Sequence, residues 1–210
     1  MQTILCMNAK GGCGKTTLAT NLAIWYADCD KKVVLADYDP QRSALDWLAA
    51  REDYEGIPEI TGLDCVDDPE ARPERGTDLL IMDAPAGIFG KDINPMLRKV
   101  DVLLIPVLPS PIDMRAVARY VEDLFNAGRI KRGTTRVALV ENRVRENSKI
   151  FHTLDGFLKK YDIPVLTHLR ESQNYIKTAE TGLGIFELPQ STALKDIVLW
   201  DPIIEWLELG

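Results

Sequence analysis

Six short apolar runs constrain the fold of this chain more than any other feature of its sequence. None of them alternates polar and apolar residues as a strand with one wet face does, so we expect strands buried on both faces. Buried strands separated by helical segments predict an α/β fold: a doubly wound, mostly parallel sheet flanked by helices, with ligands at the carboxyl ends of the strands. The predicted strands are residues 3–7, 32–36, 78–82, 101–107, 136–140 and 164–169.

The clearest predicted helix covers residues 110–127. Ser110 can accept a hydrogen bond from the first turn as an N-cap, and Pro111 suits the first helical position. Gly128 is expected to end the helix. Spacings of three and four residues place the apolar side chains on one face, as in a helix that covers a sheet. These side chains are Met114, Val117, Ala118, Val121, Leu124 and Phe125.

Length and composition indicate one globular domain, residues 1–210, that is large enough to bury a core. With 46% hydrophobic and 27% charged residues, the chain is not disordered, collagen-like or a coiled coil. The four cysteines, at positions 6, 13, 29 and 65, match neither a metal-binding pair nor a disulfide framework. No apolar run reaches the ~18 residues of a membrane span and no signal region precedes the first strand, so we expect a cytoplasmic protein.

Charge is segregated along the chain. The net charge is −7, so only a local basic patch could attract a polyanion such as nucleic acid. Residues 51–78 hold three basic and ten acidic residues and show no regular pattern. Residues 129–149 hold seven basic and two acidic residues, and 7 minus 2 gives a net charge of +5. The basic residues are Arg129, Lys131, Arg132, Arg136, Arg143, Arg145 and Lys149, and the acidic ones are Glu141 and Glu146.

A glycine-rich loop, residues 9–17, joins the first predicted strand to an apolar helix. Its glycines let backbone N–H groups surround phosphate oxygens, and the N-terminus of the helix adds positive potential. Lys15 supplies a point charge, and the Thr16 hydroxyl can reach Mg²⁺. The loop therefore predicts a site for a nucleoside triphosphate with Mg²⁺. A dinucleotide site fits less well, because no third glycine follows Gly12 and Gly14 at the required spacing.

This loop departs from the usual pattern G-x-x-x-x-G-K-[ST] at one position and has two notable residues at positions that the pattern leaves open. The pattern needs glycine at position 9, where the chain has Ala9, and an additional lysine, Lys10, stands next to it. Cys13 lies at a helix N-terminus near two lysines, and such surroundings can lower the pKa of a thiol and make it reactive. The simpler interpretation, which we favour, is that Cys13 is a small residue in a tight loop.

Carboxylates follow two of the predicted strands, at the edge where a bound phosphate would lie. Asp37 and Asp39 come after residues 32–36, and Asp83 comes after residues 78–82. A Mg²⁺ ion that bridges two phosphates keeps several waters, and these waters need acidic acceptors nearby. Asp83 is therefore expected to serve the metal site. The alternative is a set of solvated aspartates without such a role.

Three motifs resemble those of the ParA/MinD family of ATPases. Residues 10–17 are similar to its deviant Walker A box, residues 37–41 to its D-x-D-P-Q box, and residues 83–87 to the switch after its Walker B strand. The chain looks most like short plasmid-partition ATPases of the ParF kind and McdA-type carboxysome-positioning ATPases. The likeness continues over residues 106–113, 140–144, 167–173 and 184–187.

The resemblance implies a P-loop NTPase fold with ATP and Mg²⁺ as ligands. Lys10 is expected to reach across a sandwich homodimer to the partner's phosphates, as an arginine finger does. Asp39 is expected to position the attacking water and, with Lys10 and Lys15, to form the catalytic set. The implied metal residues are Thr16, Asp37 and Asp83. The implied nucleotide residues are Lys10, Gly11, Gly12, Cys13, Gly14, Lys15, Thr16, Thr17 and, near the adenine, Asn142.

The resemblance further implies a switch that works on DNA. The ATP-bound homodimer would bind DNA nonspecifically and so associate with the nucleoid. A ParB-type adaptor would direct the partition of plasmid or chromosomal DNA, whereas an McdB-type adaptor would direct carboxysome positioning. Operator binding is not expected, because the phosphate-loop strand starts at residue 2 or 3 with no helix-turn-helix before it. The DNA-binding residues would be the basic segment 129–149, joined by Lys159, Lys160, Arg170 and Lys177.

Other outputs fit the residues less well. Membrane cycling of the MinD kind needs a basic amphipathic tail, whereas residues 201–210 carry three acids and no base. Nitrogenase-type iron proteins need cysteines downstream of the Walker boxes, and none follows Cys65. An ATP-dependent metabolic synthetase stays open as the alternative of another class, although no second polar constellation marks a substrate pocket. His152 and His168 are expected to be structural.

Overall fold

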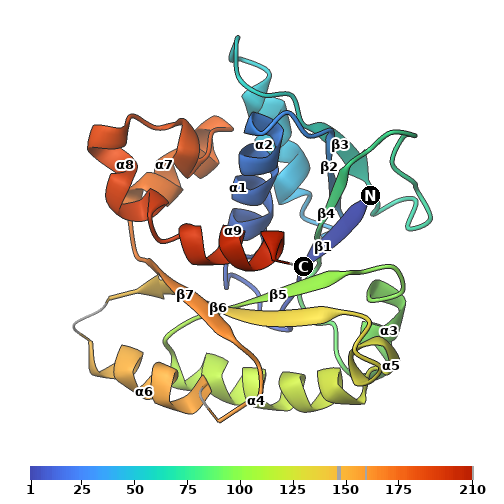
Figure 1. Cartoon of the computed structure of the whole chain (residues 1–210), viewed down its shortest axis with the longest axis vertical. Coiled ribbons are helices and arrows are strands. Elements are labelled where there is room, and N and C mark those ends of the chain that lie inside the picture. Colours follow the sequence, from blue (N-terminus) through green and yellow to red (C-terminus); the bar gives the residue numbers. More distant parts are fainter. Residues whose placement is uncertain (146–147, 159, 210) are drawn as a thin grey trace.

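The computed structural model describes residues 1–145, 148–158 and 160–209, in which seven parallel strands form one sheet (Figure 1). Glu146 and Lys159 lie outside the described residues, as does the side chain of Lys131. The strand order β3-β2-β4-β1-β5-β6-β7 starts at β1 in the centre and reaches both edges, so the sheet is doubly wound. The strands are β1 (Gln2–Cys6), β2 (Val33–Asp37), β3 (Thr61–Asp64), β4 (Leu79–Asp83), β5 (Val102–Val107), β6 (Arg136–Val144) and β7 (Val165–Arg170).

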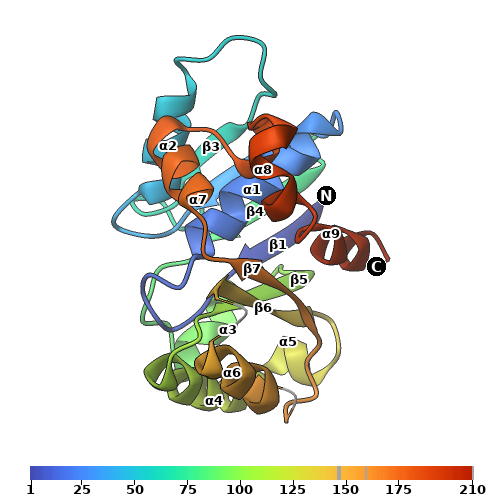
Figure 2. The same ribbon diagram turned by 90° about the vertical axis from the view of Figure 1, so that its left-hand side faces the viewer.

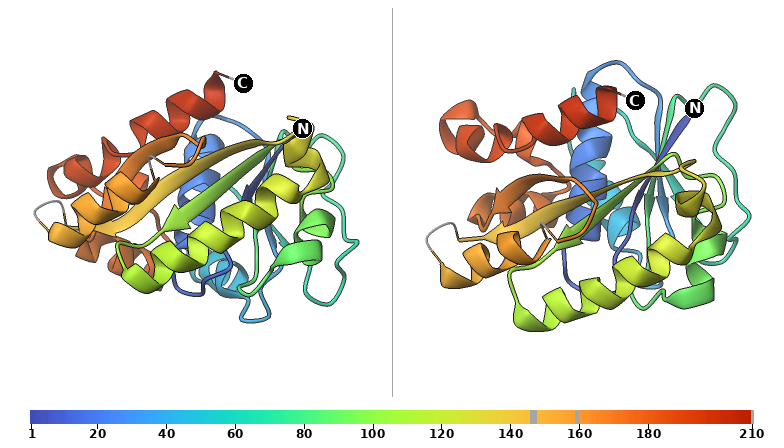
Figure 3. Two further views of the ribbon diagram at one scale, coloured as in Figure 1. Left: turned by 90° about the horizontal axis from the view of Figure 1, so that it is seen from below. Right: turned by 60° about the horizontal axis from the view of Figure 1, so that its bottom comes forward.

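Helices cover both faces of this sheet (Figure 2 and Figure 3). One face carries α1 (Lys15–Asp28), α2 (Ser43–Arg51), α7 (Gln173–Thr181), α8 (Gln190–Ile197), α9 (Asp201–Glu208) and the 3₁₀ turn η2 (Ile185–Glu187). The other face carries α3 (Ile93–Met96), α4 (Pro111–Asn126), α5 (Gly128–Lys131), α6 (Lys149–Leu158) and the turn η1 (Gly90–Asp92). Among the described residues, no helix has the length and apolar character needed to cross a bilayer.

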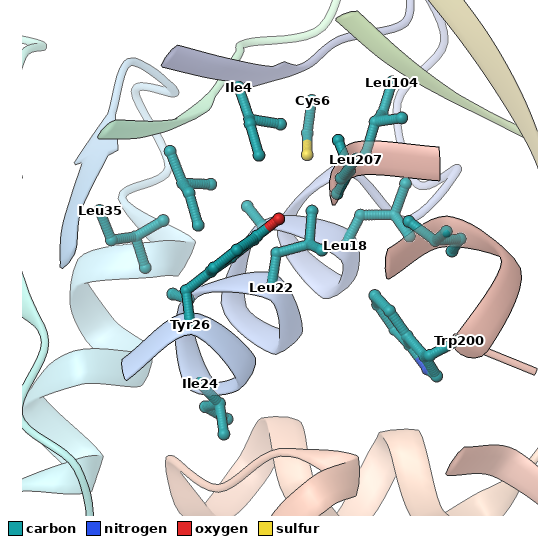
Figure 4. Close-up of a cluster of buried hydrophobic side chains, with 14 of the residues drawn as sticks. Ile4, Cys6, Leu18, Leu22, Ile24, Tyr26, Leu35, Leu104, Trp200 and Leu207 are labelled. Atoms are coloured by element: carbon teal, nitrogen blue, oxygen red, sulfur yellow. The ribbon is translucent and has the colours of Figure 1, made fainter. Parts of the chain in front are cut away.

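Two layers of apolar side chains hold the sheet between these helices. On one face, Leu18 of α1 and Leu207 of α9 lie in a cluster with Ile4 of β1 (Figure 4). On the other face, Val117 of α4 lies in a cluster with Leu5, the next residue of β1. Because successive strand residues point to opposite faces, each uninterrupted apolar run supplies both layers.

The six predicted strands are all present. Four of them are shifted by one residue at both ends, β5 starts one residue later than predicted, and β6 continues four residues beyond residue 140, to Val144. Three of the four added residues are polar, and the extension pairs with β7 at the carboxyl edge of the sheet. β3 was not predicted, because it is an edge strand whose residues are mostly exposed and form no apolar run.

The predicted helix is present as α4, and Ser110 caps it as expected. Ser110 accepts a 3.5 Å hydrogen bond from the Asp113 N–H as the N-cap. Phe125 was expected in the apolar stripe but is 44% exposed, whereas Tyr120 is buried. The expectation that Gly128 ends the helix was wrong. Ala127 is already extended, and Gly128 starts α5 with its N–H donated to a side-chain oxygen of Asn94.

Candidate functional site

The glycine-rich loop connects the buried end of β1 to α1 by a tight turn. Gly12 (φ 72°) and Gly14 (φ 101°) lie in the left-handed region, which strains residues that carry a side chain. A Cβ on Gly14 would lie 2.0 Å from Nδ2 of Asn142. The turn delivers the chain into α1, whose first N–H groups have no intrahelical partner and can bind an anion.

Hydrogen bonds hold this loop from both sides. Asn8 donates from Nδ2 to the Pro106 carbonyl at 2.7 Å and accepts from the Lys10 N–H at 3.2 Å. The Gly87 N–H, in the segment after β4, donates to the Ala9 carbonyl at 2.9 Å. The loop is therefore fixed between β5 and the segment after β4, and an incoming phosphate would meet a preformed site.

The two lysines of the loop lie in different surroundings. Lys15 is 6% exposed and lines a cavity beside the loop. Its positive charge lowers the pKa of Asp83, against the effect of burial. Lys10 is exposed and does not line that cavity. Only Lys15 thus faces the chain's own cavity, whereas Lys10 is accessible to a second molecule.

The structure decides between the two interpretations of Cys13. Its side chain is buried, and its Sγ donates to the Lys10 carbonyl at 3.2 Å. Burial raises the pKa of the thiol and outweighs the opposing effect of Lys15. A buried, protonated thiol is a poor nucleophile, so Cys13 serves as a small residue in a tight loop.

Asp37 ends β2 and holds the first turn of α2. Its Oδ2 accepts from the N–H groups of Ala44 at 2.9 Å and Leu45 at 3.2 Å. Its Oδ1 accepts from the N–H of Asp39 at 2.9 Å. Burial raises the pKa of Asp37, although the three N–H groups favour the ionised form. Asp37 therefore fixes both the start of α2 and the backbone at Asp39.

Asp83, the last residue of β4, is 1% exposed and accepts the Thr16 hydroxyl at Oδ2, at 2.6 Å. Burial, together with the charges of Asp37 and Asp39, raises its pKa to about 7 in spite of Thr16 and Lys15. Oδ1 of Asp83 is also buried and has no hydrogen-bond partner among the described residues. A buried carboxylate with an unpartnered oxygen, next to a threonine hydroxyl, fits a cation.

The kind of cation that fits is a largely hydrated one. No group of three histidine, cysteine or acidic side chains within the described ranges is arranged to hold a metal by itself. Mg²⁺ usually keeps several waters and takes one or two protein ligands together with substrate phosphates. Thr16 and Asp83 are enough to supply that share.

A cavity of about 690 Å³ opens beside the loop. It brings most of the predicted nucleotide residues together with Asp39, which approaches from the segment after β2. Cys13, Asp37, Asp83 and Asn142 are buried and do not line it. The predicted residues that do line it are Gly11, Gly12, Gly14, Lys15, Thr16, Thr17 and Asp39.

Asn142 supports the glycine-rich loop from the end of β6. Its Nδ2 donates to the Cys13 carbonyl at 2.8 Å, and its Oδ1 accepts from the Arg143 N–H at 2.9 Å. The carboxamide therefore fixes the loop against β6. Contact between Asn142 and an adenine stays a prediction.

One wall of the cavity was not predicted from the sequence. It is formed by Trp47 of α2, by Tyr175 and Thr178 of α7, and by Arg143. Trp47 and Tyr175 reach the cavity only because α2 packs against α7, a contact that no local pattern indicates. Arg143 was grouped with the basic segment, although its position directly after Asn142 is a signal that could have placed it here.

The basic segment does not form one patch, because β6 separates its two halves. One half lies at the amino ends of the strands and the other at their carboxyl ends. Arg129 donates inward to backbone carbonyls, and the Arg136 guanidinium lies 3.9 Å from the ring centroid of Trp206. Arg170 forms an ion pair with the buried Asp196. Exposed cations at the carboxyl ends of the strands include Arg145, Lys149 and Lys195 of α8. Arg145 pairs with Glu171, and it lines a shallow pocket together with Lys195.

A parallel doubly wound sheet whose first strand and first helix are joined by a glycine loop ending in Lys15 and Thr16 is typical of a P-loop nucleotide-binding protein. The chain belongs to the CbiA family, described as the CobQ/CobB/MinD/ParA nucleotide binding domain, which matches residues 4–185. ParA/MinD proteins within this family are nucleotide-binding ATPases.

Relatives of known role lie in the partition and positioning branch of this family. The maintenance of carboxysome distribution protein A of Halothiobacillus neapolitanus is 28% identical over 193 residues, 89% of this chain and 87% of that protein. The chromosome-partitioning ATPase Soj of Thermus thermophilus is 30% identical over 148 residues, 56% of this chain and 59% of that protein.

Solved structures share the fold along the whole chain. The MinD cell division protein of Aquifex aeolicus superposes with a TM-score of 0.73 at 20% identity, covering 99% of this chain and 97% of that one. Apo McdA of Cyanothece gives a TM-score of 0.72 at 19% identity and covers 100% of both chains. The ParA/MinD fold expected from the sequence motifs is confirmed.

Proposed function

We propose that this protein is an ATP-driven switch that positions a cargo on DNA. It binds ATP with Mg²⁺, forms a homodimer, binds DNA nonspecifically while ATP is bound, and releases it when an adaptor stimulates hydrolysis. The observation that carries the proposal is the cavity in which Lys15, Thr16 and Asp39 surround a preformed glycine loop, with Asp83 bonded to Thr16. Family membership supports the choice of a nucleotide as ligand.

In this proposal, residues 11–17 surround the phosphates with backbone N–H groups, and Lys15 neutralises their charge. Thr16 and Asp83 hold Mg²⁺, with Asp37 bonding to its waters and Asn142 lying near the adenine. Bound Mg²⁺ supplies charge neutralisation on the phosphates. All of these roles are assigned to a single domain, residues 1–210.

Asp39 positions the attacking water. It lines the cavity, its N–H is fixed by Asp37, and its Oδ1 accepts from the Gln41 N–H at 3.0 Å, so its place is well defined. Lys10, which is exposed, contacts the phosphates of the partner subunit. A cation supplied by the partner stabilises the transition state only when two subunits meet, which couples hydrolysis to dimerisation.

The exposed cations at the carboxyl edge of the sheet contact DNA in this proposal. The cations assigned to this role are Arg145, Lys149 and Lys195, and they lie on the same edge as the nucleotide cavity. A chain with a net charge of −7 needs such a local cluster, and a dimer presents it twice. Contacts of this kind go to phosphates and carry no sequence preference.

Two cargoes remain, and the adaptor distinguishes them. With a ParB-type adaptor the switch partitions plasmid or chromosomal DNA. With an McdB-type adaptor it positions a protein cargo such as carboxysomes on the nucleoid. The second candidate is favoured by the likeness to the carboxysome distribution protein over 89% of this chain.

The test is binding of the Asp39→Ala protein to random-sequence duplex DNA with ATP and with ADP, over a salt series. Without Asp39 the ATP dimer should persist, so we expect binding with ATP alone and a steep loss of affinity with salt. Asp46→Ala, which removes an exposed carboxylate of α2 outside the cavity, is the matched control and should behave as the unmodified protein. Intact ATP binding without any DNA binding would contradict the DNA step.

A further inference from the structure

A buried ion pair joins α2 to the segment that follows α7. The side chain of Arg51, the last residue of α2, is 6% exposed, and that of Glu187 is 11% exposed. Nη2 of Arg51 lies 2.5 Å from Oε1 of Glu187, and Nη1 lies 2.9 Å from Oε2. Arg51 also donates to the carbonyls of Pro58 at 3.0 Å and Gly182 at 3.1 Å. Bidentate pairing of this kind fixes orientation as well as distance.

Residues 182–187, the segment of the same chain that contains Glu187, also pack closely on α2. Trp47, one turn before the end of α2, donates from Nε1 to the Leu183 carbonyl at 3.0 Å. Gly182 has a φ of 71°, and a Cβ added to it would lie 2.3 Å from the backbone nitrogen of Arg51. Contacts this tight do not let α2 shift without moving residues 182–187 as well.

The other end of α2 lies at the nucleotide cavity. Asp37 accepts the N–H groups of Ala44 and Leu45 at the start of this helix, and it also accepts the N–H of Asp39. α2 has nine residues, so it forms a stiff rod of about 13 Å. Asp37 and α2 therefore connect the backbone at Asp39 to Arg51.

We propose that Arg51 is a positioning residue for ATP hydrolysis: it holds α2 so that Asp39 stays in place, and it transmits the nucleotide state to residues 182–187. A buried ion pair is weak evidence for stability, because well-packed apolar residues can often replace it without loss. Positioning accounts for the four hydrogen bonds that one guanidinium makes to two segments. The inference rests on the proposed ATPase function and is independent of DNA binding.

The first test is hydrogen–deuterium exchange with and without Mg-ATP, on the unmodified protein, Arg51→Met and Arg72→Met. Arg72 pairs with Glu70 on the surface and is the matched control. ATP should slow exchange at residues 9–17 in all three proteins. It should also change exchange at residues 182–187 in the unmodified protein and the control, but at least about fivefold less in Arg51→Met.

The outcomes of this test separate the two proposals. If ATP has no effect at residues 9–17 of the unmodified protein, the proposed nucleotide function fails. If ATP acts there but residues 182–187 do not respond, or respond equally in Arg51→Met, the nucleotide function stands and the inference about Arg51 is overturned.

Kinetics supply the second test. In Arg51→Met we expect kcat for ATP hydrolysis to fall at least about tenfold while KM for ATP stays within about twofold, because the phosphate loop is untouched. A folded variant with unchanged kcat would overturn the role, whatever its KM. If thermal melting shows that Arg51→Met does not fold, Glu187→Gln replaces it, since it keeps the side-chain shape. The same pattern is then expected, with a loss in kcat of about threefold or more.

Discussion

The carboxylate of Asp83 is costly to the protein when no cation is bound. Burial, with the charges of Asp37 and Asp39, raises its pKa to about 7, whereas it would be ~4 in the unfolded chain. Because the folded state has the higher pKa, the unfolded chain releases this proton first, and folding stability falls as pH rises from about 4 to about 7. The difference corresponds to at most ~4 kcal/mol.

Asp83→Asn should therefore stabilise the nucleotide-free protein in a pH-dependent way. Asparagine keeps an oxygen for the Thr16 hydroxyl and carries no charge, but its unpaired N–H groups offset part of the gain. We expect a gain of about 1–2 kcal/mol at pH 8 and little change at pH 5, measured by unfolding in EDTA. An equal effect at both pH values would exclude the buried charge as its cause. Asp46→Asn, on the surface of α2, is the control.

The two lysines of the glycine loop should fail in different ways. Lys15→Ala removes a buried cation from the cavity and is expected to abolish ATP binding. Lys10→Ala removes an exposed cation and should leave ATP affinity within about threefold, while hydrolysis falls at least about tenfold because the partner's phosphates lose their contact. An equilibrium binding assay measures ATP affinity, sedimentation measures dimerisation, and a hydrolysis assay measures turnover. Full ATPase activity in Lys10→Ala would refute the shared-lysine mechanism.

The central elements could be predicted from the sequence because each carries its own signal. A strand buried on both faces is an uninterrupted apolar run, and β2, β4 and β5 are buried along their whole length. β7 lies at an edge and is only partly buried, but it keeps enough apolar residues to be predicted. β3 lies at an edge with exposed side chains, so it resembles a loop in sequence. In α4, periodicity alone included Phe125, because the limits of an apolar stripe depend on what covers it.

The candidate site likewise has parts that a local motif predicts and parts that depend on contacts between distant elements. The glycine loop could be placed because the strand, loop and helix are contiguous in sequence. The wall made by Trp47 and Tyr175 could not, since it depends on the packing of α2 against α7. Arg51 and Glu187 are 136 positions apart, and a buried ion pair between them has no local pattern. What sequence motifs miss here is the contact between elements that are distant in the chain.

At the scale of the whole molecule, charge is divided between the two sides of the sheet, one ending in β3 and the other in β7. The acidic segment 51–78 contains β3, which forms one edge, whereas the basic segment 129–149 contains β6, next to the opposite edge. We expect the proposed DNA contact on the side of β6, because the acidic side repels a polyanion. The basic segment is further divided, because some of its residues lie at the amino ends of the strands and others at their carboxyl ends.

Charge reversal at one end of the strands tests which of these clusters binds DNA. A triple variant, Arg145→Glu, Lys149→Glu and Lys195→Glu, changes the carboxyl edge, where the nucleotide cavity lies. We expect it to lower DNA affinity at least about 100-fold and to reduce the slope of log affinity against log salt by about three per subunit. ATP binding should be unchanged, because none of the three residues lines that cavity.

A matched triple variant changes the net charge equally at the amino ends of the strands. Its exposed residues precede β5, β6 and β7, and are replaced as Lys99→Glu, Arg132→Glu and Lys160→Glu. Long-range repulsion alone should cost this variant less than about fivefold in affinity at physiological salt, because exposed charges more than ~8 Å apart are largely screened from each other. DNA binding by filter retention or anisotropy compares the two. Equal losses in both variants would mean that net charge, and not the carboxyl edge, governs binding.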